Sequence, residues 1–199
     1  MRTTGKGYGV NIGVFGGTFD PVHWGHLIIG GYVRHALALE KIVFVPSMIS
    51  PHKQEQTAAA GEERLAMLRL AVRGEAGFEV SDMEIVRGGV SYTVDTLSQF
   101  HKISPGCHLS LLIGADNYAE FGTWKEPERV RSLARLVVMT RPGSRVDSFA
   151  ATGEEVRIRV PEIAVSSSDI RRRAKGGETI RYLVPDRVAE YIRSHHLYR

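Results

Sequence analysis

Two histidines stand beside a glycine-rich turn near the start of the chain. Residues 16–26 have the sequence GGTFDPVHWGH and follow an apolar segment, residues 10–15, that is typical of a buried strand. Glycines after such a strand let backbone N–H groups approach a phosphate, and the N-terminus of a following helix favours negative charge. His23 and His26 can donate hydrogen bonds to a phosphoryl group whose charge is changing. The sequence therefore predicts a phosphate-binding turn. Residues 16–26 lack the Gly-Lys-Ser/Thr ending of a P-loop and the G-x-G-x-x-G spacing of a dinucleotide-binding fingerprint, so the turn belongs to neither class.

A pair of histidines can also be structural or can bind a metal ion. No glutamate stands between His23 and His26, unlike in a His-Glu-x-x-His zinc site, and the single cysteine, Cys107, precludes a cysteine-rich zinc site. With the glycine turn attached, the phosphate interpretation is favoured, and we expect no protein ligands to a metal.

A second group of polar residues lies far along the chain, where residues 165–173 have the sequence VSSSDIRRR. Ser166, Ser167 and Ser168 precede an expected helix, where hydroxyls can cap the helix or bind phosphate oxygens. Arg171, in the first turn, can present a planar fork of donors to the same anion. A serine-rich cap alone indicates only a helix start. Its combination with an arginine indicates a second phosphate-binding element.

Strands and helices alternate in the expected secondary structure. We expect strands at 10–15, 42–45, 78–81, 109–113, 136–139 and 156–160, and helices at 26–39, 62–73, 94–101 and 128–133 and from about 168 and 186. Several of these strands, such as IVFV at 42–45 and LVVM at 136–139, are continuously apolar, which is typical of a parallel sheet covered on both faces. We predict a single-domain (residues 1–199), doubly wound, Rossmann-like α/β fold with a flexible N-terminus at 1–9. Ligands of such folds bind at the carboxyl ends of the strands.

The composition is that of an ordinary globular protein, with 43% hydrophobic and 24% charged residues among 199. There is no run of about 18 apolar residues and no recognisable signal peptide, so we expect a cytoplasmic protein with no membrane partner. The net charge of +4 is weak evidence for binding polyanions, and no basic stripe with interleaved aromatics indicates a nucleic-acid partner.

Taken together, GGTFDPVHWGH and VSSSDIRRR resemble the two nucleotide motifs of the nucleotidyltransferase superfamily. The chain is more closely similar to bacterial nicotinate-nucleotide adenylyltransferases. Further matches follow in order along the chain, namely FVP at 44–46, PHK at 51–53, SYT at 91–93, GAD at 114–116, TW at 123–124 and RPG at 141–143. The resemblance covers nearly all of the chain from about Val10 onward.

This resemblance implies an enzyme that transfers AMP from ATP to nicotinate mononucleotide, giving deamido-NAD and pyrophosphate in NAD biosynthesis. It implies Mg²⁺ bound mainly through the ATP phosphates, and it is compatible with a homo-oligomer. The residues implied to act on the phosphates are His23, His26, Lys53 and Arg171. Those implied to bind ATP are Gly16, Gly17, Thr18, Phe19, Asp116, Ser166, Ser167 and Ser168. Those implied to bind the acceptor are Tyr92, Thr93, Trp124 and Arg141.

Two positions depart from the family pattern. The family commonly has Asn after the proline that ends the second strand and Pro-Pro before His-Lys, whereas this chain has Ser47 and Ser50. Because this segment is expected to touch the acceptor, nicotinamide mononucleotide or another phosphorylated acceptor stays open as the preferred substrate. A non-catalytic nucleotide sensor is the alternative from another class. The length of the 47–61 loop makes it a candidate lid.

Overall fold

The computed structural model describes residues 9–51, 58–140 and 155–199. Within these residues, six parallel strands form one sheet in the order β3-β2-β1-β4-β5-β6. The strands are β1 (Asn11–Gly17), β2 (Lys41–Pro46), β3 (Phe78–Val80), β4 (His108–Gly114), β5 (Arg135–Thr140) and β6 (Val156–Arg159). The strand order reverses between β1 and β4, the two central strands, so the topological switch point lies at their carboxyl ends.

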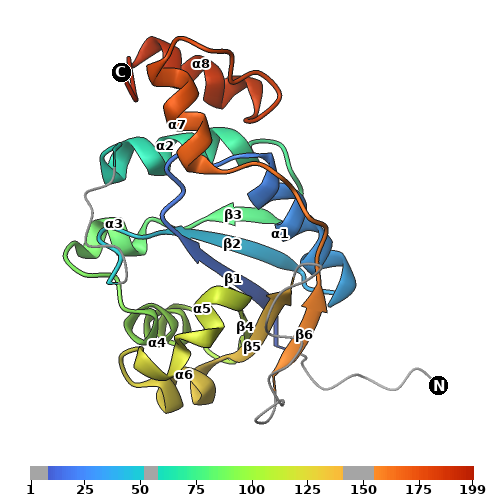
Figure 1. Ribbon diagram of the computed structural model, residues 1–199. Coiled ribbons are helices and arrows are strands. Elements are labelled where there is room, and N and C mark those ends of the chain that lie inside the picture. The colour runs from blue at the N-terminus through green and yellow to red at the C-terminus, as the bar shows by residue number, and fades with distance from the viewer. Residues whose placement is uncertain (1–8, 52–57, 141–154) are drawn as a thin grey trace.

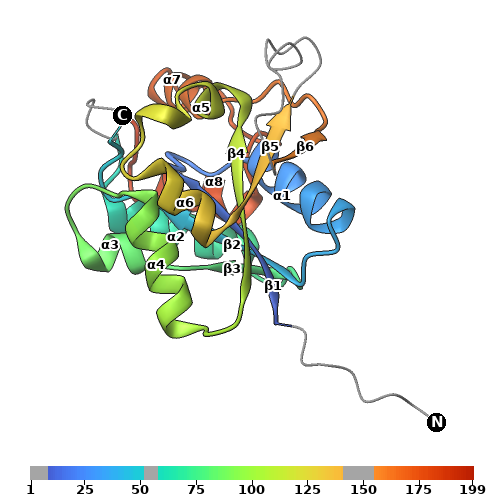
Figure 2. The same ribbon diagram turned by 90° about the horizontal axis from the view of Figure 1, so that it is seen from below.

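Helices cover both faces of the sheet, as the continuously apolar strands predict (Figure 1). The helices are α1 (Trp24–Ala36), α2 (Gly61–Val72), α3 (Met83–Arg87), α4 (Thr93–Ile103), α5 (Ala115–Ala119), η1 (Phe121–Thr123), α6 (Pro127–Leu133), α7 (Ser167–Lys175) and α8 (Asp186–Ser194). In Figure 1, α2, α7 and α8 lie above the sheet and α4, α5 and α6 below it. Figure 2, which views the molecule from below, brings α4 and α6 to the front.

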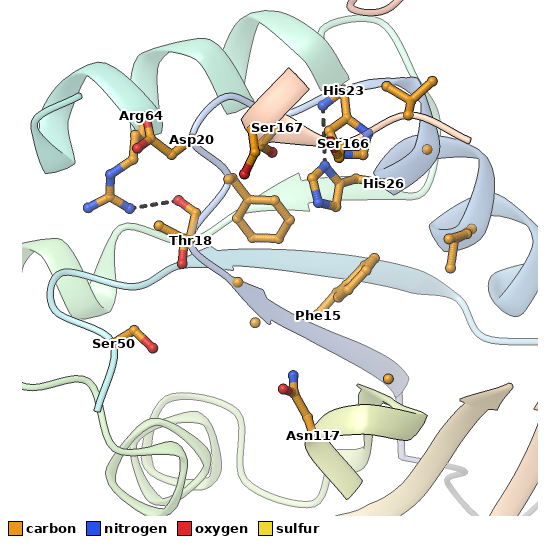
Figure 3. Close-up of a pocket in the computed structure, with 18 of the residues that line it drawn as sticks. Phe15, Thr18, Asp20, His23, His26, Ser50, Arg64, Asn117, Ser166 and Ser167 are labelled. Atoms are coloured by element: carbon orange, nitrogen blue, oxygen red, sulfur yellow. Dashed lines mark hydrogen bonds between the residues drawn. The ribbon is translucent and has the colours of Figure 1, made fainter. Parts of the chain in front are cut away.

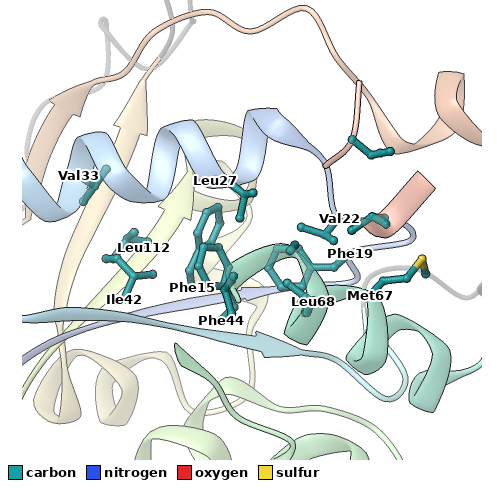
Figure 4. Close-up of a cluster of buried hydrophobic side chains, with 14 of the residues drawn as sticks. Phe15, Phe19, Val22, Leu27, Val33, Ile42, Phe44, Met67, Leu68 and Leu112 are labelled. Atoms are coloured by element: carbon teal, nitrogen blue, oxygen red, sulfur yellow. The ribbon is translucent and has the colours of Figure 1, made fainter. Parts of the chain in front are cut away.

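Two hydrophobic cores result, one on each face. Alternate residues of one strand point to opposite sides, so Phe15 and Phe44 pack with Leu27 and Leu68 in one core (Figure 4), while Val14 joins the other. The first core joins the sheet to α1, α2, α7 and α8, and the second joins it to α3, α4 and α6. None of the helices in the described part of the chain has both the length and the apolar character needed to cross a membrane.

The predicted single-domain, doubly wound fold is confirmed, and the differences are local. The helix expected at 26–39 ends at Ala36, because Ala38 has a φ of 49°, which no α-helix accommodates. Helices α3 and α5 were not predicted, since five residues are too few to show a helical period. Of the N-terminus predicted to be flexible, residues 1–8 lie outside the described residues.

Candidate active site

A cavity of about 1230 Å³ opens at the carboxyl ends of β1 and β4, where the topology predicts a ligand. The first turn of α1, the start of α5 and the start of α7 complete its wall (Figure 3). Eleven of the predicted site residues line this one cavity: Gly16, Gly17, Thr18, Phe19, His23, His26, Asp116, Ser166, Ser167, Ser168 and Arg171. The fold thus brings together two sequence motifs that lie more than a hundred residues apart.

The two histidines form a stacked pair at the start of α1. Their ring centroids are 3.8 Å apart, with 29° between the planes. The backbone N–H of His23 donates to Nδ1 of His26 over 3.2 Å, so in the neutral ring Nε2 of His26 carries the proton and can donate it. Gly25 makes room for this arrangement, because a Cβ there would lie 2.9 Å from the His23 ring. The geometry therefore fixes one N–H donor beside the glycine turn.

Phe19 supports this pair from the core side. Its ring is only 3% exposed and packs edge-on against the His26 ring, with centroids 4.9 Å apart, and also against Phe15 and Phe44. The sequence predicts Phe19 as an ATP-binding residue. The structure places its side chain in the core, from which it supports the ring of His26.

The start of α7 is fastened to the turn before α1. Ser167 Oγ donates to the Pro21 carbonyl over 2.9 Å, and Nη1 of Arg171 donates to the Asp20 carbonyl over 2.7 Å. Ser166 caps the helix by accepting from the Asp169 N–H, and Nη2 of Arg171 lies 3.4 Å from Ser168 Oγ. Since the Ser167 hydroxyl proton is already donated, that hydroxyl can only accept from a further partner in this arrangement.

The next two arginines, Arg172 and Arg173, form ion pairs at the surface of α7. Arg172 pairs with Asp169 and Glu178 at 2.7 Å each, and Arg173 pairs with the same two carboxylates. Both therefore belong to a surface ion-pair network. This difference places Arg171, and not the next residue along, at the cavity.

A second, smaller cavity of about 180 Å³ holds the residues predicted to bind the acceptor ring. Tyr92, Thr93 and Trp124 line it together with Pro51, Thr123 and Lys125. The Lys125 ammonium lies 4.6 Å from the centre of the Tyr92 ring and 3.2 Å from the Asp95 carboxylate. Trp124 is half-buried and packs on Phe121, with centroids 5.3 Å apart, so it is both a core contact and a cavity wall.

Two predicted residues, Lys53 and Arg141, lie outside the described residues, as does the middle of the candidate lid at 52–57. Asp116 is placed in the first turn of α5, with an exposed side chain at the cavity edge.

Two buried charged residues were missed at the sequence level, Asp20 and Arg64. Asp20 is 4% exposed, and its carboxylate accepts from the N–H groups of Ala58 (2.8 Å) and Ala59 (3.2 Å) and from the Tyr198 hydroxyl (2.7 Å). Asp20 thereby ties the glycine turn to the end of the 47–61 loop and to the C-terminal segment. Burial, reinforced by the Asp20 charge, raises the pKa of Tyr198 well above its usual value, so this phenol stays a donor.

Tyr198→Phe is expected to lower the free energy of unfolding by about 2 kcal/mol, because it removes a hydrogen bond to a buried carboxylate. Urea unfolding followed by circular dichroism measures the change. Tyr182→Phe is the matched control, since Tyr182 is 74% exposed. Equal stability of the two variants would show that the Tyr198 contact contributes nothing.

Comparison with known proteins places this site in a family. The cytidylyltransferase-like family model matches residues 14–173. A Desulfitobacterium hafniense protein named "Probable nicotinate-nucleotide adenylyltransferase" is 42% identical over 94% of this chain and 95% of its own length. A Thermus thermophilus protein of the same name is 43% identical over 96% of this chain and 100% of its own.

Solved structures agree on the fold. A Plasmodium falciparum nicotinic acid mononucleotide adenylyltransferase complexed with NaAD superposes with a TM-score of 0.77 at 18% identity, covering 95% of this chain and 97% of that one. On these sequence relationships, the chain belongs to the nicotinate-nucleotide adenylyltransferase family of cytidylyltransferase-like proteins.

Proposed function

We propose that this chain transfers the adenylyl group of ATP to nicotinate mononucleotide, forming deamido-NAD and pyrophosphate in NAD biosynthesis, in the cytoplasm. One observation carries the proposal beyond family membership. The His23–His26 pair and the Ser166–Arg171 segment line one cavity, and the aromatic acceptor pocket at Tyr92 and Trp124 lies at the same end of the sheet.

The reaction needs no protein nucleophile. The phosphate of the mononucleotide is already an anion, so one of its oxygens attacks the α-phosphorus of ATP in line. The bond from that phosphorus to the bridging oxygen breaks, and pyrophosphate leaves. Catalysis then consists of positioning the two substrates and stabilising the charge that develops.

Each part of the large cavity has a role in this proposal. The Nε2–H of His26 and the adjacent His23 donate to the phosphates as charge shifts toward pyrophosphate. The turn formed by Gly16, Gly17 and Thr18 presents backbone N–H groups to the triphosphate. At the start of α7, the backbone N–H groups, Ser166, Ser168 and the part of the Arg171 fork not held by Asp20 bind the β- and γ-phosphates. Asp116 accepts from a ribose hydroxyl.

In the second cavity Trp124 stacks on the pyridine ring beside Tyr92 and Thr93. Lys53 and Arg141, expected near the acceptor, stay predictions from the sequence.

We expect Mg²⁺ to be bound mainly through the ATP phosphates. No group of three or more His, Cys, Asp or Glu side chains in the described segments is arranged to hold a metal. Asp20 already accepts three hydrogen bonds, which leaves Asp116 and Glu162 as the described carboxylates that line the cavity with capacity for a water of the ion. When bound, the ion neutralises charge on the phosphates.

The acceptor base is expected to be nicotinate in preference to nicotinamide. Helix α4 begins at Thr93 in the acceptor pocket, and the first N–H groups of a helix favour a carboxylate over an amide that presents its own NH₂ donor. We expect kcat/KM for nicotinate mononucleotide to exceed that for nicotinamide mononucleotide by about a hundredfold, since mismatched polar groups cost a few kcal/mol.

Steady-state assays at matched ATP and Mg²⁺ measure this ratio, with phosphopantetheine as a third acceptor. A ratio near one would show that the departures at Ser47 and Ser50 remove the selectivity for nicotinate over nicotinamide. Turnover of phosphopantetheine alone would overturn the assignment of the acceptor. Ser50 lines the large cavity, whereas the backbone of Ser47 is held by Gly17, so Ser50 is the first position to test.

A further inference from the structure

Arg64, in the first turn of α2, is a buried cation that the mechanism above does not use. Its side chain is 0% exposed, and it donates hydrogen bonds to four backbone carbonyls. Nε donates to Ala59 (3.2 Å), Nη1 donates to Thr18 and Ser47 (2.7 Å each), and Nη2 donates to Met48 (3.2 Å). Figure 3 shows the guanidinium reaching from α2 to Thr18.

Burying the Arg64 guanidinium costs free energy unless its N–H donors are satisfied, and here the four carbonyls accept hydrogen bonds from all three of its nitrogens. Burial lowers the pKa of Arg64, and the nearby Asp20 charge partly offsets this. The flat, five-donor guanidinium can meet several carbonyls at fixed angles. The ammonium of a lysine cannot meet the same set. The arrangement is therefore specific to arginine.

Three of the four carbonyls belong to segments that are expected to contact different substrates. Thr18 lies in the turn predicted to hold the ATP phosphates, directly after β1. Ser47 and Met48 directly follow β2, and the Ser47 N–H donates to the Gly17 carbonyl over 2.9 Å. Arg64 thus joins the segment that follows β1 to the segment that follows β2.

From Met48 the contacts continue to the acceptor pocket. The Met48 N–H donates to Ser91 Oγ over 2.9 Å, and the Ser91 N–H donates to the Ile49 carbonyl over 2.9 Å. Tyr92 and Thr93, which line that pocket, are the next residues along the chain. A short series of hydrogen bonds therefore runs from the phosphate turn through Arg64 and Ser91 to the acceptor pocket.

We propose that Arg64 is a positioning residue that fixes the distance between the ATP-phosphate turn and the acceptor-binding segment. This inference rests on the proposed function. In-line attack requires the mononucleotide phosphate close to the α-phosphorus and opposite the leaving group. A displacement of about 1 Å between the two subsites would therefore reduce turnover by about a hundredfold while each subsite still binds its own ligand.

The first test is Arg64→Lys, which keeps the charge and removes the fork. We expect kcat to fall by about a hundredfold, with the Kd of a non-hydrolysable ATP analogue and the KM for nicotinate mononucleotide each within about threefold of wild type. Arg69→Lys is the matched control and is expected to behave as wild type. Arg69 lies on the same helix, where it is exposed and pairs with Asp82.

A kcat within about threefold of wild type would mean that only the charge matters, and it would overturn the proposal. A fall in kcat that merely follows the folded fraction measured by circular dichroism would overturn it as well. If the wild-type protein does not turn over nicotinate mononucleotide, both the proposed function and the proposed role of Arg64 are overturned. If the wild-type protein turns over the mononucleotide and Arg64→Lys has the same kcat, only the proposed role of Arg64 is overturned.

A milder change tests the same series of contacts and leaves the Arg64 guanidinium in place. Ser91→Ala removes the acceptor of the Met48 N–H and also the Ser91 hydrogen bond to the buried Glu84 carboxyl. Loss of the Met48 contact is expected to lower kcat by about fivefold. Ser98→Ala is its control on α4, because Ser98 Oγ donates to the Val94 carbonyl of its own helix.

Combining Arg64→Lys with Ser91→Ala is expected to be no worse than Arg64→Lys alone, since both remove one connection. Full additivity in the double variant, or a Ser91→Ala variant that matches Ser98→Ala, would show that the series does not position the acceptor.

Discussion

His26→Ala is expected to lower kcat by about a hundredfold or more, the usual cost of removing one preorganised donor to a developing charge. His23→Ala is expected to have a similar effect, because it removes both a donor beside the phosphates and the ring that stacks on His26. Interactions made only in the transition state lower kcat and kcat/KM together. The Kd of a non-hydrolysable ATP analogue should therefore change by much less than kcat.

His35→Ala provides the control for this pair, since His35 is exposed in the last turn of the same helix. Circular dichroism checks that all three variants fold. Near-normal kcat in both His23→Ala and His26→Ala would contradict the assignment of the phosphate turn.

Arg171→Lys is expected to weaken ATP binding by about tenfold or more, because the lysine ammonium cannot reproduce the planar fork. The variant would also lose the 2.7 Å hydrogen bond from Nη1 to the Asp20 carbonyl, which joins α7 to the turn before α1. Direct titration with ATP and a parallel kcat measurement separate the loss of affinity from the loss of turnover.

Arg172→Lys is the matched control for the register of the motif. The Arg172 side chain is 59% exposed and pairs with Asp169 and Glu178 at the surface, so little change in ATP affinity is expected. If Arg172→Lys is impaired while Arg171→Lys is normal, the phosphate-binding arginine has been assigned one residue out of place.

Much of the fold could be predicted from local patterns, because a strand buried on both faces must be continuously apolar. Val14 and Phe15 show this, since they are adjacent in β1 and pack in opposite cores. The short helices α3 and α5 could not be predicted in this way. Their place is set by the loop that leads into α4 and by the end of β4.

Where a motif keeps its residues close in sequence, as with His23 and His26, the structure brings them together at one cavity, and their roles stay predictions. Phe19 belongs to the same motif, and its side chain packs in the core. The motif gives the residue type but not the direction of the side chain, so this packing could not be predicted.

Asp20 and Arg64 escaped prediction for a different reason. Their partners, among them Tyr198 and Met48, are distant in sequence and largely backbone groups, which carry no sequence signal. One clue was available for Arg64, since a helix at 62–73 places it one turn before Leu68 on the apolar face.

The most direct test of the proposed function is transfer of the α-phosphate from ATP. Wild-type protein is incubated with ATP radiolabelled at the α-phosphorus, Mg²⁺ and nicotinate mononucleotide, and the products are separated by chromatography. We expect label in deamido-NAD, unlabelled pyrophosphate in equal amount, and no release of label when the mononucleotide is omitted. Label that appears as AMP or ADP without an acceptor, or that never enters a dinucleotide, would contradict it.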